Sequence, residues 1–289
     1  MGMGYAYSTV GGDVSVIYFN PATLALSPES SMSITYEITH QSNLTADDIF
    51  QPERLKLRNL IFIGFSSDKG AFSWRPLAND FKRVESGADW AETETKINAY
   101  TFSVTNKQEN DVYSGLNISY LTGRIAQSQI VGAVPFTNIS DGNGVSLDLG
   151  TVYKVSDEFA LGLNLKNLCG FMWWDDYETD LLPFTMVAGL SFNISRFSVF
   201  AFDWEKRYYR KDGSDPVEMT HFGIEQSLGS ILSFQFGIYG QDLSRQKAKT
   251  TAGLSYQKSG YMLSLAGEKY QLADADVNRY LFSLNIPMK

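Results

Sequence analysis

Few residues in this chain could carry out covalent chemistry. The only histidines are His40 and His221, and the only cysteine is Cys169. A serine hydrolase elbow, a phosphate-binding loop and a zinc protease each need a local motif, G-x-S-x-G, G-x-x-x-x-G-K-[ST] or H-E-x-x-H, and the sequence contains none of them. One cysteine also excludes a disulfide framework and a cysteine-cluster metal site. We therefore expect neither enzyme activity nor a cofactor.

His221 and Glu225 come nearest to an acid–base or metal-binding pair, because they share one face of a predicted strand. Side chains four residues apart on a strand are about 13 Å from each other, so these two cannot share a proton or a metal ion. Function must then depend on the shape, charge and apolar surface of the fold, so the secondary structure has to be predicted first.

Almost every segment after residue 30 alternates apolar and polar residues, which is the signature of a β-strand. In 31–38, for example, Met32 and Ile34 fall on one face and Ser33 and Thr35 on the other. We predict about fourteen such strands, near residues 31–38, 57–65, 70–77, 95–105, 112–125, 145–154, 158–167, 184–193, 196–205, 218–227, 231–239, 248–256, 260–269 and 277–286. No segment keeps a helical period beyond a turn or two.

The connections between these strands alternate long and short. Long loops are predicted at about 39–56, 78–94, 126–144, 168–183 and 206–217, and short turns at 66–70, 106–110, 156–157, 193–196 and 228–230. The last three connections are moderate, short and moderate. This alternation is typical of an outer-membrane barrel, whose short turns lie at the periplasmic rim and whose long loops face outside. An even number of strands would place both chain ends on the periplasmic side.

The composition favours a barrel in a membrane. Apolar residues make up 44% of the 289 residues, charged ones 19% and aromatics 14%, which excludes a disordered chain. Apolar runs such as 60–65 reach about six residues, whereas a membrane helix needs about 20. Only helices and closed sheets satisfy their backbone in hydrocarbon, so we predict an all-β transmembrane antiparallel barrel of about 14 strands. A soluble all-β protein is the alternative, because the mean hydropathy is only −0.17.

The two faces of each strand have different predicted surroundings. The apolar face would contact lipid and the polar face would line the lumen. The charged or titratable lumen residues are Glu37, Asp148, Lys166, Asp203, His221, Glu225, Glu268 and Arg279. We expect them to form ion pairs that fix the strands, with a polar permeation path as the alternative. Aromatics expected at the membrane interfaces are Tyr5, Trp74, Trp90, Trp204, Tyr208, Tyr209 and Tyr270. The net charge of −8 argues against a nucleic-acid partner.

The first 30 residues interrupt the strand pattern. They are too rich in glycine for a membrane strand and too apolar for a tail, so we expect 1–30 to pack as a hatch inside a barrel formed by 31–289. Pro21 moves Asn20 out of the helical region, and the Asn20 side chain can then bond nearby backbone. The predicted hatch residues are Gly11, Gly12, Asp13, Asn20, Pro21 and Ala22. The sequence favours neither of two hypotheses over the other, a hatch that moves and a plug that is fixed.

The segment 12–24, Gly-Asp-Val-Ser-Val-Ile-Tyr-Phe-Asn-Pro-Ala-Thr-Leu, resembles the hatch of FadL-type outer-membrane transporters and of their shorter UPF0164 and PorV/PorQ-type relatives. Weaker likeness at 161–183 and 220–256 extends the resemblance over most of the chain. The resemblance implies a 14-stranded barrel and a hydrophobic ligand. In that family a kinked early strand opens a side passage to lipid. Here the predicted third strand is short and ends at Pro76, which is compatible with such a gap, although an ordinary strand end is the simpler interpretation.

The densest apolar cluster outside the predicted strands is 171–177, Phe-Met-Trp-Trp-Asp-Asp-Tyr. Exposed aromatics at this density usually mark a binding surface. We expect a collecting site for a hydrophobic ligand, made by Phe136, Phe171, Met172, Trp173, Trp174, Tyr177, Leu181 and Leu182. The alternatives are a loop folded over the barrel mouth and aromatics seated in the outer leaflet. The acidic residues in 175–180 could bridge divalent ions to lipopolysaccharide, although solvated charge is the simpler interpretation.

The sequence leads to two functional hypotheses. The first is an outer-membrane channel for passive uptake of small, fatty-acid-like hydrophobic molecules, with outer-membrane lipid and lipopolysaccharide around it. The second is a PorV/PorQ-like component of an outer-membrane protein complex, with other outer-membrane proteins as partners. A general polar porin is third. Met1-Gly2-Met3-Gly4 lacks the basic and apolar order of a signal peptide, so under the membrane hypothesis the numbering begins at a mature chain with an added start.

Overall fold

The computed structural model describes residues 1–26, 30–41, 58–86, 89–108, 110–132, 134–209, 214–244, 248–272 and 275–288. Two short 3-10 helices precede the sheet, η1 (Val14–Tyr18) and η2 (Pro21–Leu26). The strands are β1 (Ser31–Gln41), β2 (Arg58–Ser66), β3 (Gly70–Ser86), β4 (Asp89–Lys107), β5 (Val112–Val131), β6 (Val134–Lys154), β7 (Phe159–Trp174), β8 (Asp180–Leu181), β9 (Phe184–Ser195), β10 (Ser198–Tyr208), β11 (Val217–Leu228), β12 (Leu232–Gly240), β13 (Lys249–Lys258), β14 (Tyr261–Leu272) and β15 (Ala275–Pro287).

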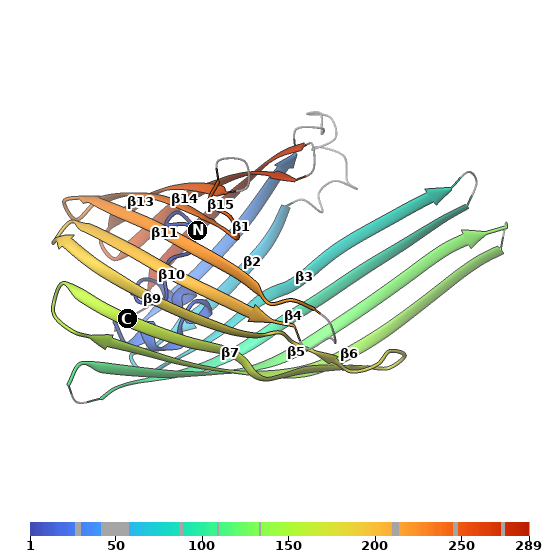
Figure 1. The fold of residues 1–289 in the computed structure, drawn as a ribbon, viewed down its shortest axis with the longest axis horizontal. Helices are drawn as coiled ribbons and strands as arrows, with labels where there is room; N and C mark the ends of the chain where they lie inside the picture. The colour runs from blue at the N-terminus through green and yellow to red at the C-terminus, as the bar shows by residue number, and fades with distance from the viewer. Residues whose placement is uncertain are drawn as a thin grey trace.

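The strands form one closed antiparallel barrel (Figure 1). Successive strands pair along the chain, except that β7 pairs with β9 past the short β8, and β1 pairs with β15, so the described strands close into a ring. Of the fifteen strands, β8 is a two-residue pairing on the end of β7, which leaves fourteen around the barrel. The predicted fold class and strand number are therefore confirmed.

Side chains on the barrel wall point as the alternation predicts. On β4 and β5, Ser103 and Asn117 are buried inside, and the Ser103 hydroxyl donates to Asn117 Oδ1 at 2.7 Å. Their chain neighbours Phe102 and Ile118 face outward and are 55% and 51% exposed. A barrel with a polar interior and an apolar exterior is arranged for a surrounding hydrocarbon phase. Among the described residues, no helix is long and apolar enough to cross a bilayer.

The predicted third strand and two of the predicted long loops are wrong. β3 does not end at Pro76 but continues to Ser86, with a register shift between Pro76 and Ala78. Residues 78–94 and 126–144 are mostly strand, so β5 and β6 reach 20 and 21 residues, about twice what a bilayer requires. The third, 168–183, begins with strand as far as Trp174. Polar strand residues outside hydrocarbon lack the apolar alternation that identified the others. Most of the predicted loop at 39–56 lies outside the described residues.

The long strands β3 to β6 project beyond the rest of the barrel as a four-stranded extension (Figure 1). We call this extension the fin, and it comprises 78–86, 89–97, 123–131 and 134–142. Its outward face carries ion pairs, including Arg124 Nε to Asp141 Oδ1 at 2.7 Å. Charged side chains are costly in hydrocarbon, so the fin is suited to water and not to the interior of a bilayer.

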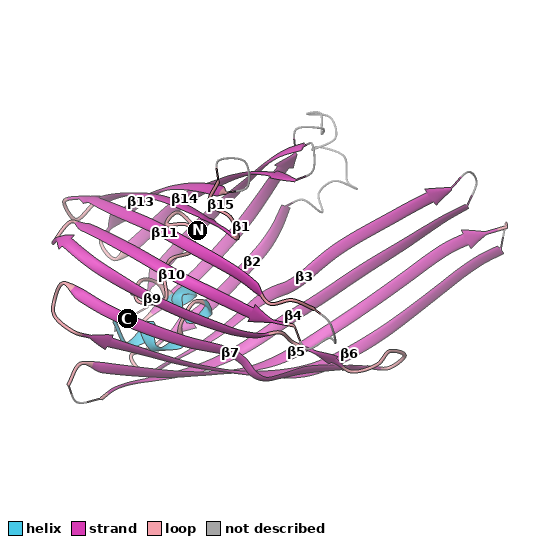
Figure 2. Cartoon of the chain, viewed as in Figure 1, coloured by secondary structure: helices cyan, strands magenta, loops and turns pink. Residues whose placement is uncertain are grey.

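Residues 1–26 lie inside the barrel, where both 3-10 helices are found (Figure 2). Buried apolar clusters join them to the wall, for example Ile17 and Leu24 with Phe62 and Ala71. Tyr5 belongs to this inner segment, so its predicted place at a membrane interface is wrong. The burial of the segment explains why the glycine-rich, apolar start of the chain could be neither strand nor tail.

Candidate functional site in the barrel interior

The start of the inner segment is fixed to β11 and β13. The Gly4 N–H donates to Thr251 Oγ1 at 2.9 Å, and the same hydroxyl donates to the Gly2 carbonyl at 2.8 Å. His221 Nδ1 donates to the Gly4 carbonyl at 2.8 Å. His221 is buried and used as a backbone anchor, so its position gives no support to a catalytic or metal-binding role.

The middle of the segment is held by Asp203 on β10. The Asp203 carboxylate accepts the backbone N–H groups of Tyr7 and Ser8, each at 3.0 Å, and also the Ser8 hydroxyl. Hydrogen bonds to a charged group are about twice as strong as neutral ones. Burial raises the pKa of the nearby Tyr7 phenol above its usual range, so Tyr7 stays neutral and can donate to Gln235 Oε1 at 3.3 Å.

Asn20, at the predicted hatch turn, holds the end of the segment. Its Nδ2 donates to the carbonyls of Ser8 at 2.7 Å and Thr151 at 3.1 Å, and its Oδ1 accepts the Ala22 N–H at 3.0 Å. From the wall, Asn117 Nδ2 donates to the Ile17 carbonyl at 2.9 Å. Asparagine suits position 20 because its short amide provides two donor hydrogens and an acceptor oxygen without charge.

The other predicted hatch residues divide into two groups. Pro21 begins η2, and Ala22 is fully buried against the wall. Asp13 caps η1 by accepting the Ser15 N–H at 2.8 Å. Gly11 and Gly12 lie at the border of two cavities, of about 290 and 380 Å³, on the side of the short turns.

Glycines on the inward face of the wall let the segment approach it. A Cβ at Gly150 would collide with the Asn20 side chain and Pro21, and one at Gly237 would collide with the backbone of Met3 and Gly4. These glycines are therefore part of the docking surface for the inner segment.

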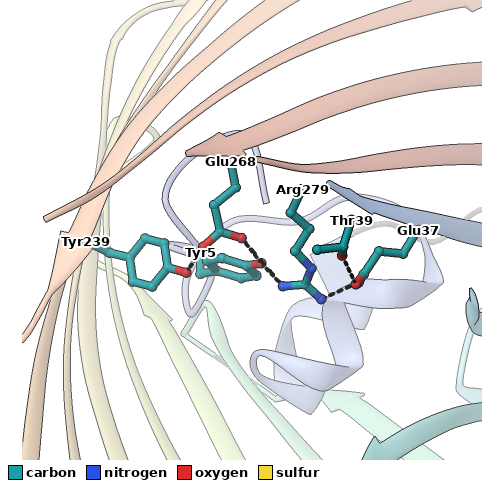
Figure 3. A network of polar contacts seen from close by, with 6 residues as sticks. All are labelled: Tyr5, Glu37, Thr39, Tyr239, Glu268 and Arg279. Atoms are coloured by element: carbon teal, nitrogen blue, oxygen red, sulfur yellow. Dashed lines mark hydrogen bonds and ion pairs between the residues drawn. The ribbon is translucent and has the colours of Figure 1, made fainter. Parts of the chain in front are cut away.

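A network of charged and phenolic groups joins Tyr5 to four strands (Figure 3). It consists of Tyr5, Glu37, Thr39, Tyr239, Glu268 and Arg279. Arg279 pairs with Glu37 and lies 3.5 Å from Glu268, and its Nη1 donates to the Tyr5 hydroxyl at 3.0 Å. Burial, and then the Glu268 charge, raise the pKa of Tyr5, so its phenol remains neutral. The network ties the inner segment to β1, β12, β14 and β15.

The remaining predicted lumen residues also face the interior. Glu225 accepts Gln235 Nε2 at 2.6 Å. Asp148 accepts the Asn167 N–H at 2.8 Å, where β7 bulges away from β6. Asn167 has a positive φ of 54°, which asparagine tolerates better than most residues.

Lys166 lies beside Tyr18 together with Arg75. The Arg75 guanidinium is 3.7 Å from the Tyr18 ring centroid and Lys166 Nζ is 4.8 Å from it. These cations, Arg75 first, lower the pKa of Tyr18 to about 8 despite the opposing effect of burial. Tyr18 is 38% exposed, so this cationic pair borders the open part of the lumen.

The predicted ligand-collecting residues do not form one cluster. Because 171–174 is strand and not loop, its side chains alternate: Met172 and Trp174 are buried, whereas Trp173 is 43% exposed. The Phe171 and Trp173 rings pack side by side, with 5.5 Å between their centroids. Of the other predicted residues, Leu182 packs inside, Leu181 and Tyr177 are exposed, and Phe136 lies on the fin.

Met172 and Trp174 join an apolar cluster at the barrel mouth. Its buried members are Ala99, Leu121, Met172 and Trp174, with Ile97, Ile125 and Leu182 packed against them. Trp174 Nε1 donates to Asp180 Oδ2 at 2.9 Å, which fixes the indole. We call these residues the mouth cluster. At the base of the fin, its accessible part is formed by the half-buried side chains of Ile97, Ile125 and Leu182.

The seam between β2 and β3 is short. These strands pair only from Ile63 with Trp74 to Ser66 with Ala71, and beyond Trp74 they diverge (Figure 1). Arg75 follows this last pair directly. In the described part of the chain, 58–62 of β2 therefore lacks β3 as a partner.

Several interior residues were not predicted. The alternation along a strand assigns each residue to a face but does not reveal which residues contact the inner segment. For this reason the sequence did not identify Tyr239, Arg75 and Tyr18. The sequence also did not identify Ala99 and Leu121 as members of an apolar cluster, because single small or apolar residues on a polar face are common. The inward parity of Leu121, opposite to the outward Tyr120, could have identified it. Among the described residues, no group of three or more His, Cys, Asp and Glu could hold a metal ion.

The geometry is shared with solved channel structures. The Ralstonia pickettii toluene transporter TbuX aligns with a TM-score of 0.67 at 11% identity, covering 100% of this chain and 98% of that one. The P. putida toluene transporter TodX gives 0.69 at 10% identity, with coverage of 100% and 98%. A Pseudomonas aeruginosa FadL homologue gives 0.63 at 10% identity, with coverage of 99% and 97%. No family model and no curated protein matches the sequence. The FadL-type fold expected from the sequence is confirmed, and these identities support the fold alone.

Proposed function

We propose that the chain is an outer-membrane channel for passive uptake of small hydrophobic molecules, such as fatty acids or monoaromatic hydrocarbons. The observation that carries the proposal is the mouth cluster, an apolar patch inside a barrel whose other wall residues are largely polar. Ligand would reach it at its half-buried side chains, Ile97, Ile125 and Leu182. Burial of ligand against it would contribute roughly 25 cal/mol per Å². The solved structures with this fold include proteins named as toluene transporters and a hydrocarbon channel.

In the proposed path, ligand collects on the mouth cluster and meets residues 1–26, which act as the hatch. The β2–β3 seam beside Arg75 then gives a lateral exit toward lipid, and the two cavities at Gly11 and Gly12 give a periplasmic one. The short turns and both chain ends lie on the periplasmic side, and the outward apolar band contacts outer-membrane lipid.

Proteoliposome uptake tests the proposal. Labelled fatty acid and labelled toluene should enter vesicles containing the protein faster than protein-free vesicles, whereas planar-bilayer conductance should stay near the leak level. Equal entry into both vesicle types would refute the hydrophobic channel. A large, steady conductance would instead favour a polar porin.

The fin favours a second candidate, a component of an outer-membrane protein complex. The strands of the fin continue for about ten residues beyond the rest of the barrel and could present an exposed sheet to a partner protein. Affinity purification from native membranes separates the candidates, because a stable stoichiometric partner supports this one and a lone barrel does not.

A further inference from the structure

The fin has a free edge along β6. β6 pairs with β5 as far as Val134, but with β7 only from Gly142 inward, where it meets Trp174. Within the described ranges, no strand lies beside 134–140 on its other side. The unpaired backbone of an edge strand is a template for another strand.

The backbone groups at this edge can be assigned. The Asp141 carbonyl accepts the Asp175 N–H at 3.0 Å, so the groups of residue 141 point away from β5. Because backbone groups alternate along a strand, those of Ile139, Thr137 and Pro135 point the same way. Proline has no N–H. The free edge thus offers the N–H and C=O of Thr137 and Ile139 and the C=O of Pro135.

The side chains of this edge are unusually apolar for their surroundings. Val134, Phe136 and Ile139 are 68%, 51% and 55% exposed. They lie farther out than the Arg124–Asp141 ion pair, and hence in water. Natural edge strands usually carry charged side chains or proline, which prevent pairing. The segment 134–140, Val-Pro-Phe-Thr-Asn-Ile-Ser, has no charged residue, and its proline lies at the outer end.

An acidic loop borders the inner end of this edge. The Asp176 N–H donates to Ser140 Oγ at 3.1 Å, which brings 175–178 against β6. Asp175, Asp176 and Glu178 are all exposed. An occupant of the edge would therefore be favoured by positive charge at this end.

We propose that the β6 edge, 134–140, binds an extended peptide segment of a partner protein by strand addition. The segment pairs its backbone with Thr137 and Ile139, places apolar side chains three positions apart beside Phe136 on the inward face and Ile139 on the outward face, and carries Lys or Arg where it meets the 175–178 loop. Main-chain bonds provide affinity in this mode, and side chains provide specificity. This inference does not depend on the transport proposal.

A peptide library displayed on phage, panned against the full chain in nanodiscs, tests the inference. Thr137→Pro removes an edge N–H without touching the β5 ladder, and Thr137→Val is the matched control that keeps it. We expect enriched peptides with apolar residues three positions apart, one on each face of the added strand, and a basic end. Thr137→Pro should weaken their binding at least tenfold, and Thr137→Val less than twofold. Combined Asp175→Asn, Asp176→Asn and Glu178→Gln should also weaken binding, whereas Asp157→Asn at the opposite rim should not.

Two results would overturn the inference. One is the absence of any peptide enriched over empty nanodiscs. The other is enriched peptides that bind the Thr137→Pro and parent proteins equally. The shift of the heat-modifiable band in gels checks that each variant is folded. Uptake of hydrophobic molecules by the Thr137→Pro protein should be unchanged. A failure of the peptide-binding inference can therefore be told apart from a failure of the transport proposal.

Discussion

Asp203 on β10 accepts a hydrogen bond from the Ser8 backbone N–H at 3.0 Å and another from the Ser8 hydroxyl. A buried strand carboxylate thus holds the middle of the inner segment, while Thr251 and Asn20 hold its two ends. These polar attachments are distributed along the segment, so each can be removed singly while the apolar contacts of η1 and η2 with the wall remain.

Asp203→Asn should loosen the segment around Ser8. The amide keeps one acceptor but loses the charge that strengthens the bonds to Tyr7 and Ser8. Loss of bonds to a charged group costs about 1.5–3 kcal/mol, so the amides of 5–10 should exchange with deuterium roughly tenfold to a hundredfold faster. Hydrogen-exchange mass spectrometry measures this, with exposed Asp157→Asn as the control. Unchanged protection would show that Asp203 does not hold the segment.

Gly150→Ala should displace the turn at Asn20, because the new Cβ would collide with the Asn20 side chain. In an Asn20→Ala background the same change should cost much less, since two of the three nearest atoms are gone. A double-mutant cycle on thermal unfolding should give a coupling of about 1–3 kcal/mol. Additive effects would mean that the two residues are not in contact.

Tyr18 should ionise at a lower pH than the other tyrosines. Its pKa in the folded chain is about 8 because of Arg75 and Lys166, against about 10 for a free phenol. Because its pKa is lowered in the folded chain, ionised Tyr18 stabilises the folded state. This contribution to the free energy of unfolding is fully present above pH 10 and is lost as pH falls through 8. The absorbance difference near 295 nm between the parent and Tyr18→Phe proteins should titrate near pH 8, and Arg75→Gln should move it upward. A midpoint near 10 in the parent would contradict the contact.

The barrel was predictable because its wall obeys a two-residue period. Phe102 and Ile118 face outward while their chain neighbours Ser103 and Asn117 face inward. The alternation of apolar and polar residues in the sequence predicts this arrangement. The fin was not predictable, because pairs such as Arg124 and Asp141 outside hydrocarbon lack the apolar half of the pattern.

The interior site was predictable only in part. Asn20 and Pro21 stood out by their chemistry, but the partners Thr151 and Gly150 are more than a hundred residues away in the chain. Trp173 and Trp174 were assigned to one site as loop residues. They are strand neighbours, so they necessarily face opposite sides of the wall.

Uptake by the Trp174→Ala and Trp173→Ala proteins decides whether hydrophobic molecules pass the mouth cluster, because these neighbours differ mainly in the face of the wall that they occupy. Trp174→Ala, which removes the largest side chain of the mouth cluster, should lower uptake of labelled fatty acid at low concentration by about tenfold. Trp174→Phe should restore most of it, and Trp173→Ala should stay within twofold of the parent. If Trp173→Ala lowered uptake as much as Trp174→Ala, or if neither changed it, hydrophobic molecules would not pass the mouth cluster and the account would be contradicted.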